Sequence, residues 1–165
     1  MAEVVTVEAI LADSATTAEG KLYVQGGGWN LLHATSLPFR VPRVGIVLLL
    51  SVPWTATNQM HRLEVTLRDQ DERELPLADA PPGAVLGTQG TAGGRIHRFE
   101  AQFNVGRPPV LEVGDVQLIP IAINVDGLVF ERAGSYHFVI SVDGHEEKRL
   151  PLRVVLDLQP VARVG

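Results

Sequence analysis

The sequence predicts an all-β protein: a two-sheet antiparallel β-sandwich that is immunoglobulin-like in architecture. Three observations lead to this prediction. Apolar and polar residues alternate in several segments, as they do in a strand with one buried face. Turn signals separate these segments at intervals of roughly 8–12 residues, which is typical of a sandwich or barrel. No long segment has the periodicity of an amphipathic helix, and residues 9–19 are the only plausible helical stretch.

Four segments alternate clearly, at residues 62–68, 99–105, 136–143 and 149–154. Because successive side chains of a strand point to opposite faces, the apolar set of each segment should face one core. We expect the following residues to be buried: Leu63, Val65, Leu67, Phe99, Phe103, Phe138, Ile140 and Val142.

Two further segments, Val44–Val52 and Val116–Val125, are apolar on both faces and should be central strands. The second contains Pro120, which cannot donate to a strand ladder and must lie at a bulge or on an edge. Shorter strands are expected at residues 6–12 and 22–25.

Glycine pairs mark the expected turns. Asp126-Gly127 and Asp143-Gly144 are two-residue hairpin signals, because glycine accepts the positive φ that such turns need. Tyr136 begins a late strand after Gly134, an arrangement similar to the tyrosine corner of immunoglobulin-like sandwiches.

We expect a single domain over residues 1–158, followed by a loose tail at 159–165. A Gly/Pro-rich loop at 78–95 is expected to be mobile, since seven of residues 81–95 are glycine or proline. Strands flank this loop on both sides, and neither half alone would close a core.

Composition limits the function classes. The net charge of −5 disfavours nucleic acid, whose binding depends on neutralising phosphates. Cysteine is absent, which excludes disulfides and thiolate sites. The first residues lack the basic region of a signal peptide, and the longest apolar run, about nine residues, is far short of a membrane span of ~20. We therefore expect a cytoplasmic protein with no membrane partner.

Catalytic motifs are missing as well. No G-x-S-x-G elbow or phosphate-binding loop signature occurs, and the glycines at 26–28 precede a tryptophan where a nucleotide-binding helix would have to begin. The sequence predicts no catalytic residue and no cofactor.

Two sets of residues leave a metal site as an alternative. His33, His61, His97 and His137 show no metal-ligand spacing, yet histidines from separate strands can converge on zinc. The acidic cluster Asp69–Glu74 could resemble a calcium loop, although a polar turn neutralised by neighbouring arginines explains it equally simply.

An interaction surface could include Gly27, Trp29 and Trp54. The glycine triplet should turn the chain so that Trp29 folds over a neighbouring strand, either because φ is positive there or because backbones pass closely. The alternative is that both tryptophans serve the core or a sheet edge.

Several stretches resemble a known family: GKLYVQGGGW at 20–29, VPWTATNQMH at 52–61 and the AGSYHFVISVDG hairpin. Over about residues 8 to 156 the chain is similar to a family of short uncharacterised actinobacterial proteins, a domain of unknown function. The resemblance implies a stand-alone β-rich domain and supplies no activity.

Two functions follow as hypotheses. The first is a non-catalytic interaction module that binds a protein partner or assembles as a homo-oligomer. The second is a ligand- or metal-dependent binding protein or enzyme that uses the scattered histidines and carboxylates. Fold alone cannot separate them.

Overall fold

The computed structural model describes residues 4–79, 91–92 and 94–157, and 70% of these residues lie in strands. The described part contains no α-helix, only the short 3-10 turn η1 (Trp54–Ala56). The strands are β1 (Thr6–Ala18), β2 (Lys21–Gly27), β3 (Leu31–Ala34), β4 (Phe39–Pro53), β5 (Met60–Asp69), β6 (Glu74–Leu75), β7 (Ala78–Asp79), β8 (Thr91–Ala92), β9 (Arg95–Ile96), β10 (Arg98–Asn104), β11 (Val116–Phe130), β12 (Gly134–Val142) and β13 (His145–Leu156). The all-β prediction is confirmed.

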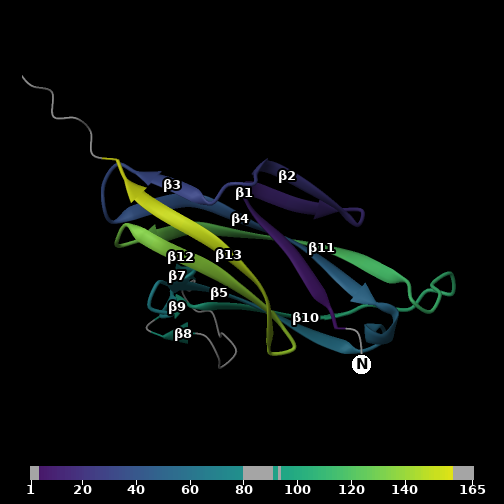
Figure 1. Cartoon of the computed structure of the whole chain (residues 1–165). Helices are drawn as coiled ribbons and strands as arrows, with labels where there is room; N and C mark the ends of the chain where they lie inside the picture. The colour runs from purple at the N-terminus through teal and green to yellow at the C-terminus, as the bar shows by residue number, and fades with distance from the viewer. Residues whose placement is uncertain (1–3, 80–90, 93, 158–165) are drawn as a thin grey trace, which may run out of the picture.

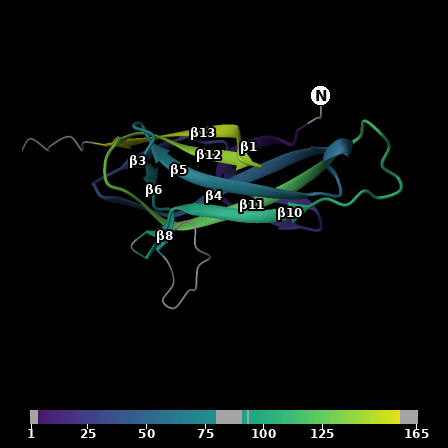
Figure 2. The same ribbon diagram turned by 90° about the horizontal axis from the view of Figure 1, so that it is seen from below.

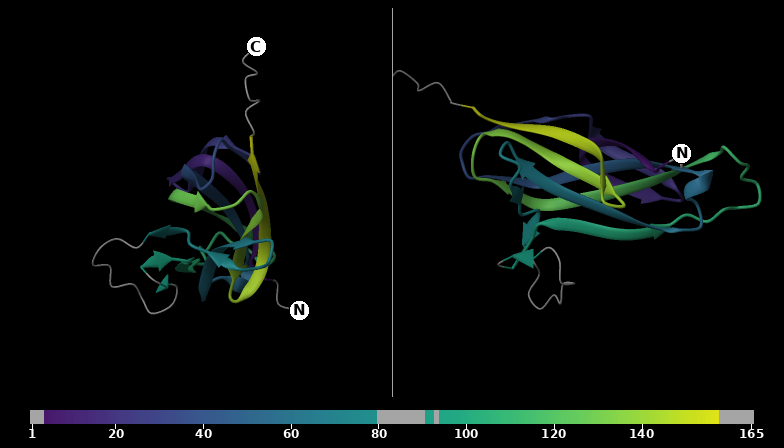
Figure 3. Two further views of the ribbon diagram at one scale, coloured as in Figure 1. Left: turned by 90° about the vertical axis from the view of Figure 1, so that its left-hand side faces the viewer. Right: turned by 60° about the horizontal axis from the view of Figure 1, so that its bottom comes forward.

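Two large sheets face each other (Figures 1 and 2). The first sheet has the order β11-β4-β1-β2, and the second has the order β10-β5-β12-β13-β3, with β6 added beside β5. The view along the strands in Figure 3 shows that the sheets curve toward one another like part of a barrel. Pairing is antiparallel except that β3 runs parallel to β13, which the prediction of purely antiparallel sheets did not include.

The apolar core fills the space between the two large sheets. Leu48 of β4 and Phe138 of β12 are fully buried there, as are most of the residues expected from alternation. Six of the eight expected core residues are buried, and Phe99 and Phe103 are the exceptions. Both lie on β10, an edge strand of the second sheet, so solvent reaches one side of each ring.

Two expectations about strands were wrong. The plausible helix at 9–19 is strand, because β1 pairs with β4 on one side and with β2 on the other. The segment Val116–Val125 is an edge strand and not a central one, since β11 pairs only with β4. Pro120 therefore sits where an edge tolerates a missing N–H, opposite Leu49. The central position of Val44–Val52 is confirmed.

The two Asp-Gly signals have different outcomes. Asp143-Gly144 joins β12 to β13 with φ of +52° and +80°, as predicted. Asp126-Gly127 lies inside β11, which continues to pair with β4 on both sides of it, so the predicted hairpin is wrong. Gly127 adopts a φ of +72° within the strand. Tyr136 donates a hydrogen bond of 2.6 Å to the carbonyl of Arg132, the link expected of a tyrosine corner.

The predicted loop 78–95 is partly ordered into a third, small sheet with the order β7-β9-β8. Figure 1 places this sheet at one end of the molecule. The predicted mobility of the loop concerns mostly residues 80–90 and 93, which lie outside the described residues, as does the predicted tail at 159–165.

Candidate functional site

Exposed apolar side chains gather at one end of the molecule. Twelve large apolar residues are exposed in the described part of the chain, and six of them belong to this end. We call it the apolar tip and define it by Val4, Trp54, Met60, Val110, Val113, Val116 and Leu118. Val110 is 83% and Val113 80% exposed, which is unusual for neighbours on one loop.

Strand register explains why these residues meet. Val116 begins β11 opposite Pro53, the last residue of β4, and Met60 begins β5 opposite Asn104, the last residue of β10. The loop 105–115 joins β10 to β11 and extends beyond the sheet ends, as Figures 1 and 2 show. The strand pairing therefore brings one apolar loop and four strand ends together.

Trp54 and Arg107 anchor the loop to the sheets. The Arg107 guanidinium lies 3.5 Å from the centre of the Trp54 ring, a cation–π contact. It also donates hydrogen bonds to the Trp54 carbonyl at 3.1 Å and to the Thr57 hydroxyl at 2.7 Å. The Thr57 hydroxyl in turn donates to the same carbonyl. No sequence pattern indicates this role for Arg107, because Trp54 lies 53 residues away along the chain.

Further hydrogen bonds hold the loop in one shape. The backbone N–H of Arg107 donates to the Asn58 side chain at 3.1 Å, and Gln117 donates to the Gly106 carbonyl at 2.9 Å. Asp115 accepts from the backbone N–H of Glu112 at 2.8 Å. The exposed valines therefore sit on a preformed surface, which reduces the ordering cost of binding.

His61 is a buried histidine of β5, next to Met60 of the apolar tip. Its ring is 4% exposed, stacks on Phe103, and has an acceptor at each nitrogen: the Ala56 carbonyl and the Asp143 carboxylate, each at 2.7 Å. Burial lowers the pKa of His61, but the two acceptors outweigh burial and raise the pKa above its ordinary value of 6.5. The pKa of Asp143 is correspondingly lowered. A histidine whose two nitrogens both face acceptors is an imidazolium, so an ion pair links β5 to the β12–β13 turn and a hydrogen bond links β5 to η1.

The charges of the tip are unbalanced toward the acidic side. Glu112 and Asp115 lie on the loop and are exposed, whereas Arg107, its basic residue, is occupied by Trp54 and Thr57. Among the described residues neither Glu112 nor Asp115 makes an ion pair, so the tip presents apolar side chains beside two carboxylates and one arginine.

Trp29 and Gly27 lie elsewhere, and the structure does not bring them to Trp54. Trp29 is half-buried and packs against the core. Gly27 lies opposite Ala12, which pairs with Gly45 of β4. Trp54 follows the end of that strand, about 30 Å away at ~3.3 Å per residue. The positive φ expected in the glycine triplet is found at Gly26 (+59°) and Gly28 (+91°). Gly27 has no positive φ, and an added Cβ there would meet Val24 at 2.9 Å and Ile10 at 3.2 Å.

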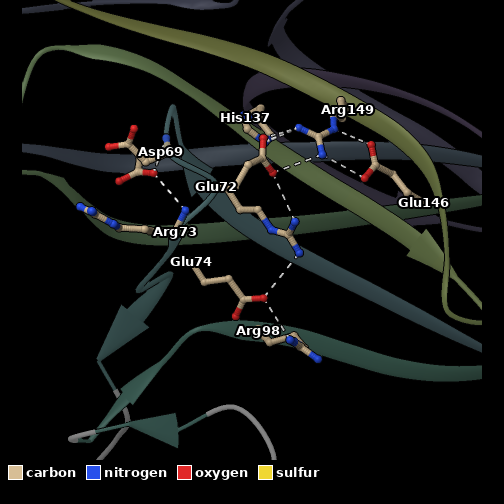
Figure 4. A network of polar contacts seen from close by, with 10 residues as sticks. Asp69, Glu72, Arg73, Glu74, Arg98, His137, Glu146 and Arg149 are labelled. Carbon is tan, nitrogen blue, oxygen red and sulfur yellow. Dashed lines mark hydrogen bonds and ion pairs between the residues drawn. The ribbon is translucent and has the colours of Figure 1, made fainter.

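The acidic cluster Asp69–Glu74 forms a turn joined to a network of ion pairs (Figure 4). Asp69 accepts the backbone N–H groups of Asp71 and Arg73. Glu72 pairs with Arg149 at 2.8 Å, and this hydrogen bond is the main reason that the pKa of Glu72 falls to about 2. The carboxylates of Asp69, Glu72 and Glu74 have basic or backbone partners, as the polar-turn interpretation expected.

The histidines do not converge. His33 pairs with Asp157, His61 with Asp143, and His137 lies beside Glu72 and Arg149. Within residues 4–79, 91–92 and 94–157, no three histidine or carboxylate side chains form a group suited to a metal ion. His97, immediately before β10, belongs to no such group either.

The model of one protein family, described as a family of unknown function (DUF6941), matches residues 8–155. The chain belongs to the DUF6941 family. No curated protein and no solved structure matches the chain. The region matched by DUF6941 runs from β1 into β13, so it contains both large sheets and most of the apolar tip. This confirms the resemblance to an uncharacterised family. No helix in the described part of this DUF6941 chain is long and apolar enough to cross a membrane.

Proposed function

We propose that this DUF6941 protein is a non-catalytic interaction module that binds a protein partner through the apolar tip. The observation that carries the proposal is the pair Val110 and Val113, four-fifths exposed on a loop that Arg107 holds in place. Exposed apolar patches rimmed by polar residues are typical of protein-binding surfaces. A preformed loop at the end of a sheet scaffold is also a common place for recognition.

The charge of the tip favours a partner different from the protein itself. Two copies meeting tip to tip would place Glu112 and Asp115 near the same residues of the other copy, and like charges at an interface oppose association. A partner with apolar side chains and a basic rim would bury the valines and neutralise the carboxylates. We therefore propose such a basic, apolar protein surface as the occupant.

The architecture supports this use of the molecule. We propose that the two curved sheets are a divergent immunoglobulin-like sandwich, and the Tyr136–Arg132 hydrogen bond is the specific feature in favour. Such sandwiches present binding loops at the ends of their sheets, as the loop 105–115 does here.

The test is affinity capture from the native cell with three forms of the whole protein, followed by mass spectrometry and light scattering. The variant V110S/V113S should lose a basic partner that the parent enriches. The control I10S/V24S removes two apolar side chains that are 43% and 40% exposed away from the tip, and should keep it. Enrichment of the same proteins by all three forms would overturn the proposal. If the parent and the control have the mass of a dimer and V110S/V113S has the mass of a monomer, the tip binds a second copy of this chain and not a different partner.

A further inference from the structure

An open cavity of about 540 Å³ lies at the end of the molecule opposite the apolar tip. Four arginines line it: Arg40 of β4, Arg73 after the β5 turn, Arg95 of β9 and Arg132 between β11 and β12. Its distance from the tip is about 40 Å, because Arg40 and Pro53 stand at opposite ends of β4. The two sites are therefore independent.

Among the described residues, three of these arginines have no carboxylate partner. Arg95 lies 3.9 Å from Asp79, at the limit of an ion pair. For Arg40, Arg73 and Arg132, no carboxylate oxygen of the described residues lies within 4.0 Å of the guanidinium. The sequence 80–90 contains no aspartate or glutamate that could supply one.

The carboxylates that line the same cavity are mostly engaged elsewhere. Asp69 accepts two backbone N–H groups of its own turn, and Glu74 accepts from Arg98 at 3.0 Å. Figure 4 shows the Arg73 guanidinium pointing away from Glu74 and Arg98. Glu131, which has no ion pair among the described residues, and Asp69, whose two backbone hydrogen bonds leave its charge in place, remain to oppose these three arginines. Four arginines and four carboxylates line the cavity. With Asp79 beside Arg95 and Glu74 paired with Arg98 outside the cavity, three arginines face two carboxylates, a small excess of positive charge in a protein whose net charge is −5.

The position of Arg40 is set by a glycine. Its guanidinium occupies the space that a Cβ on Gly127 would need, so it lies against the backbone of β11. This explains the Asp126-Gly127 pair inside a strand, which the turn prediction could not. Gly127 also lines the cavity, and the guanidinium is therefore held at the cavity wall.

We propose that this cavity binds a small organic phosphate. The planar fork of arginine matches the oxygens of a phosphate group, and several forks can share one doubly charged group. The volume falls in the usual range for small-molecule sites, roughly 300–1,000 Å³, and exceeds what a phosphate alone requires. Leu75, Pro76 and Val129, the last 38% exposed, supply an apolar wall for the organic part.

The test is calorimetric titration of the whole protein with inorganic pyrophosphate and with ADP, in chloride of matched ionic strength. Both should bind saturably, and ADP should bind more tightly because its organic part reaches the apolar wall. The variant R73Q/R132Q should weaken both at least tenfold. R153Q is the matched control, since Arg153 is exposed on β13, makes no ion pair among the described residues and lies outside the cavity.

Three outcomes would overturn the proposal: no saturable binding beyond the effect of chloride, equal affinity for R73Q/R132Q and R153Q, or binding only to vesicles that contain phosphatidic acid. The last would assign the arginines to lipid headgroups at a surface and not to a small molecule. None of these outcomes bears on the apolar tip, whose partner binding is measured separately.

Discussion

Arg107 covers the ring of Trp54 at 3.5 Å and donates a hydrogen bond to the carbonyl of the same residue. One side chain therefore fixes both the ring and the backbone at the start of η1. Val110 and Val113 follow Arg107 within the same loop, so the stack determines where they are presented. This relationship gives the first prediction.

Replacing Arg107 by alanine should lower the free energy of unfolding by about 1–2 kcal/mol, because a cation–π contact and two hydrogen bonds are lost. Lysine should restore only part of this, since its ammonium cannot make the forked contacts of a guanidinium. Denaturant melts measure both. Arg153→Ala is the control and should change stability by less than about 0.5 kcal/mol. An Arg107→Ala protein as stable as this control would show that the stack does not hold the loop.

The His61–Asp143 ion pair predicts a pH dependence. The raised pKa of His61 means that its stabilisation is complete below 6.5 and is lost as the pH rises through the folded-state pKa. The lowered pKa of Asp143 means that its stabilisation is complete above 3.8 and is lost as the pH falls through the folded-state pKa. The pair should thus stabilise most between these two values.

Urea melts from pH 5 to 9 check this expectation. The parent should lose stability above pH 6.5, and His61→Gln should lose less over the same interval because it carries no titrating charge. His33→Gln, at a histidine side chain that is 57% exposed, should follow the parent. If His61→Gln and the parent have the same slope, the imidazolium assignment is wrong.

Two glycines of the first sheet should respond differently to alanine. A Cβ on Gly45 would approach the backbone of Ala12 and Ser14 at 3.2 Å, and the backbone there is also held by Asn124, which bonds to Ala15. A Cβ on Gly27 would meet the exposed side chain of Val24, which can move. We expect Gly45→Ala to cost about 1–3 kcal/mol and Gly27→Ala less than 1.

Thermal or denaturant melts of the two single variants measure the difference. Gly27→Val, which adds a branched side chain at the same place, should fall between them at about 1–2 kcal/mol. If Gly45→Ala and Gly27→Ala lower the free energy of unfolding equally, the β1 backbone near Ala12 moves aside as easily as the Val24 side chain does, which would contradict this prediction.

Much of the fold was predictable because side-chain alternation is a local property. Leu63, Val65 and Leu67 alternate with polar neighbours, and this pattern correctly identified β5 and its buried face. The Asp126-Gly127 pair shows the limit. Its local signal equals that of Asp143-Gly144, but pairing with Arg43 and Val41 of β4 continues through it, and such pairing is not encoded in the dipeptide.

The candidate sites were less accessible to sequence reasoning. The sequence names Trp54 as a candidate surface residue, and the side chain is half-buried, but its partner Arg107 is distant in the chain and belongs to no motif. His61 and Asp143 are 82 residues apart and meet only because β5 and β12 are neighbours. Trp29 and Gly27 were grouped with Trp54 on residue type alone, and the register separates them.

Amide hydrogen exchange of the whole protein, alone and bound to the partner recovered by capture, tests the central claim most directly. Our account predicts that protection on binding is concentrated in residues 106–118, with smaller changes at the start of β5. Protection confined to β1 and β2, or to the charged outer face of β12 and β13, with residues 106–118 unchanged, would contradict it.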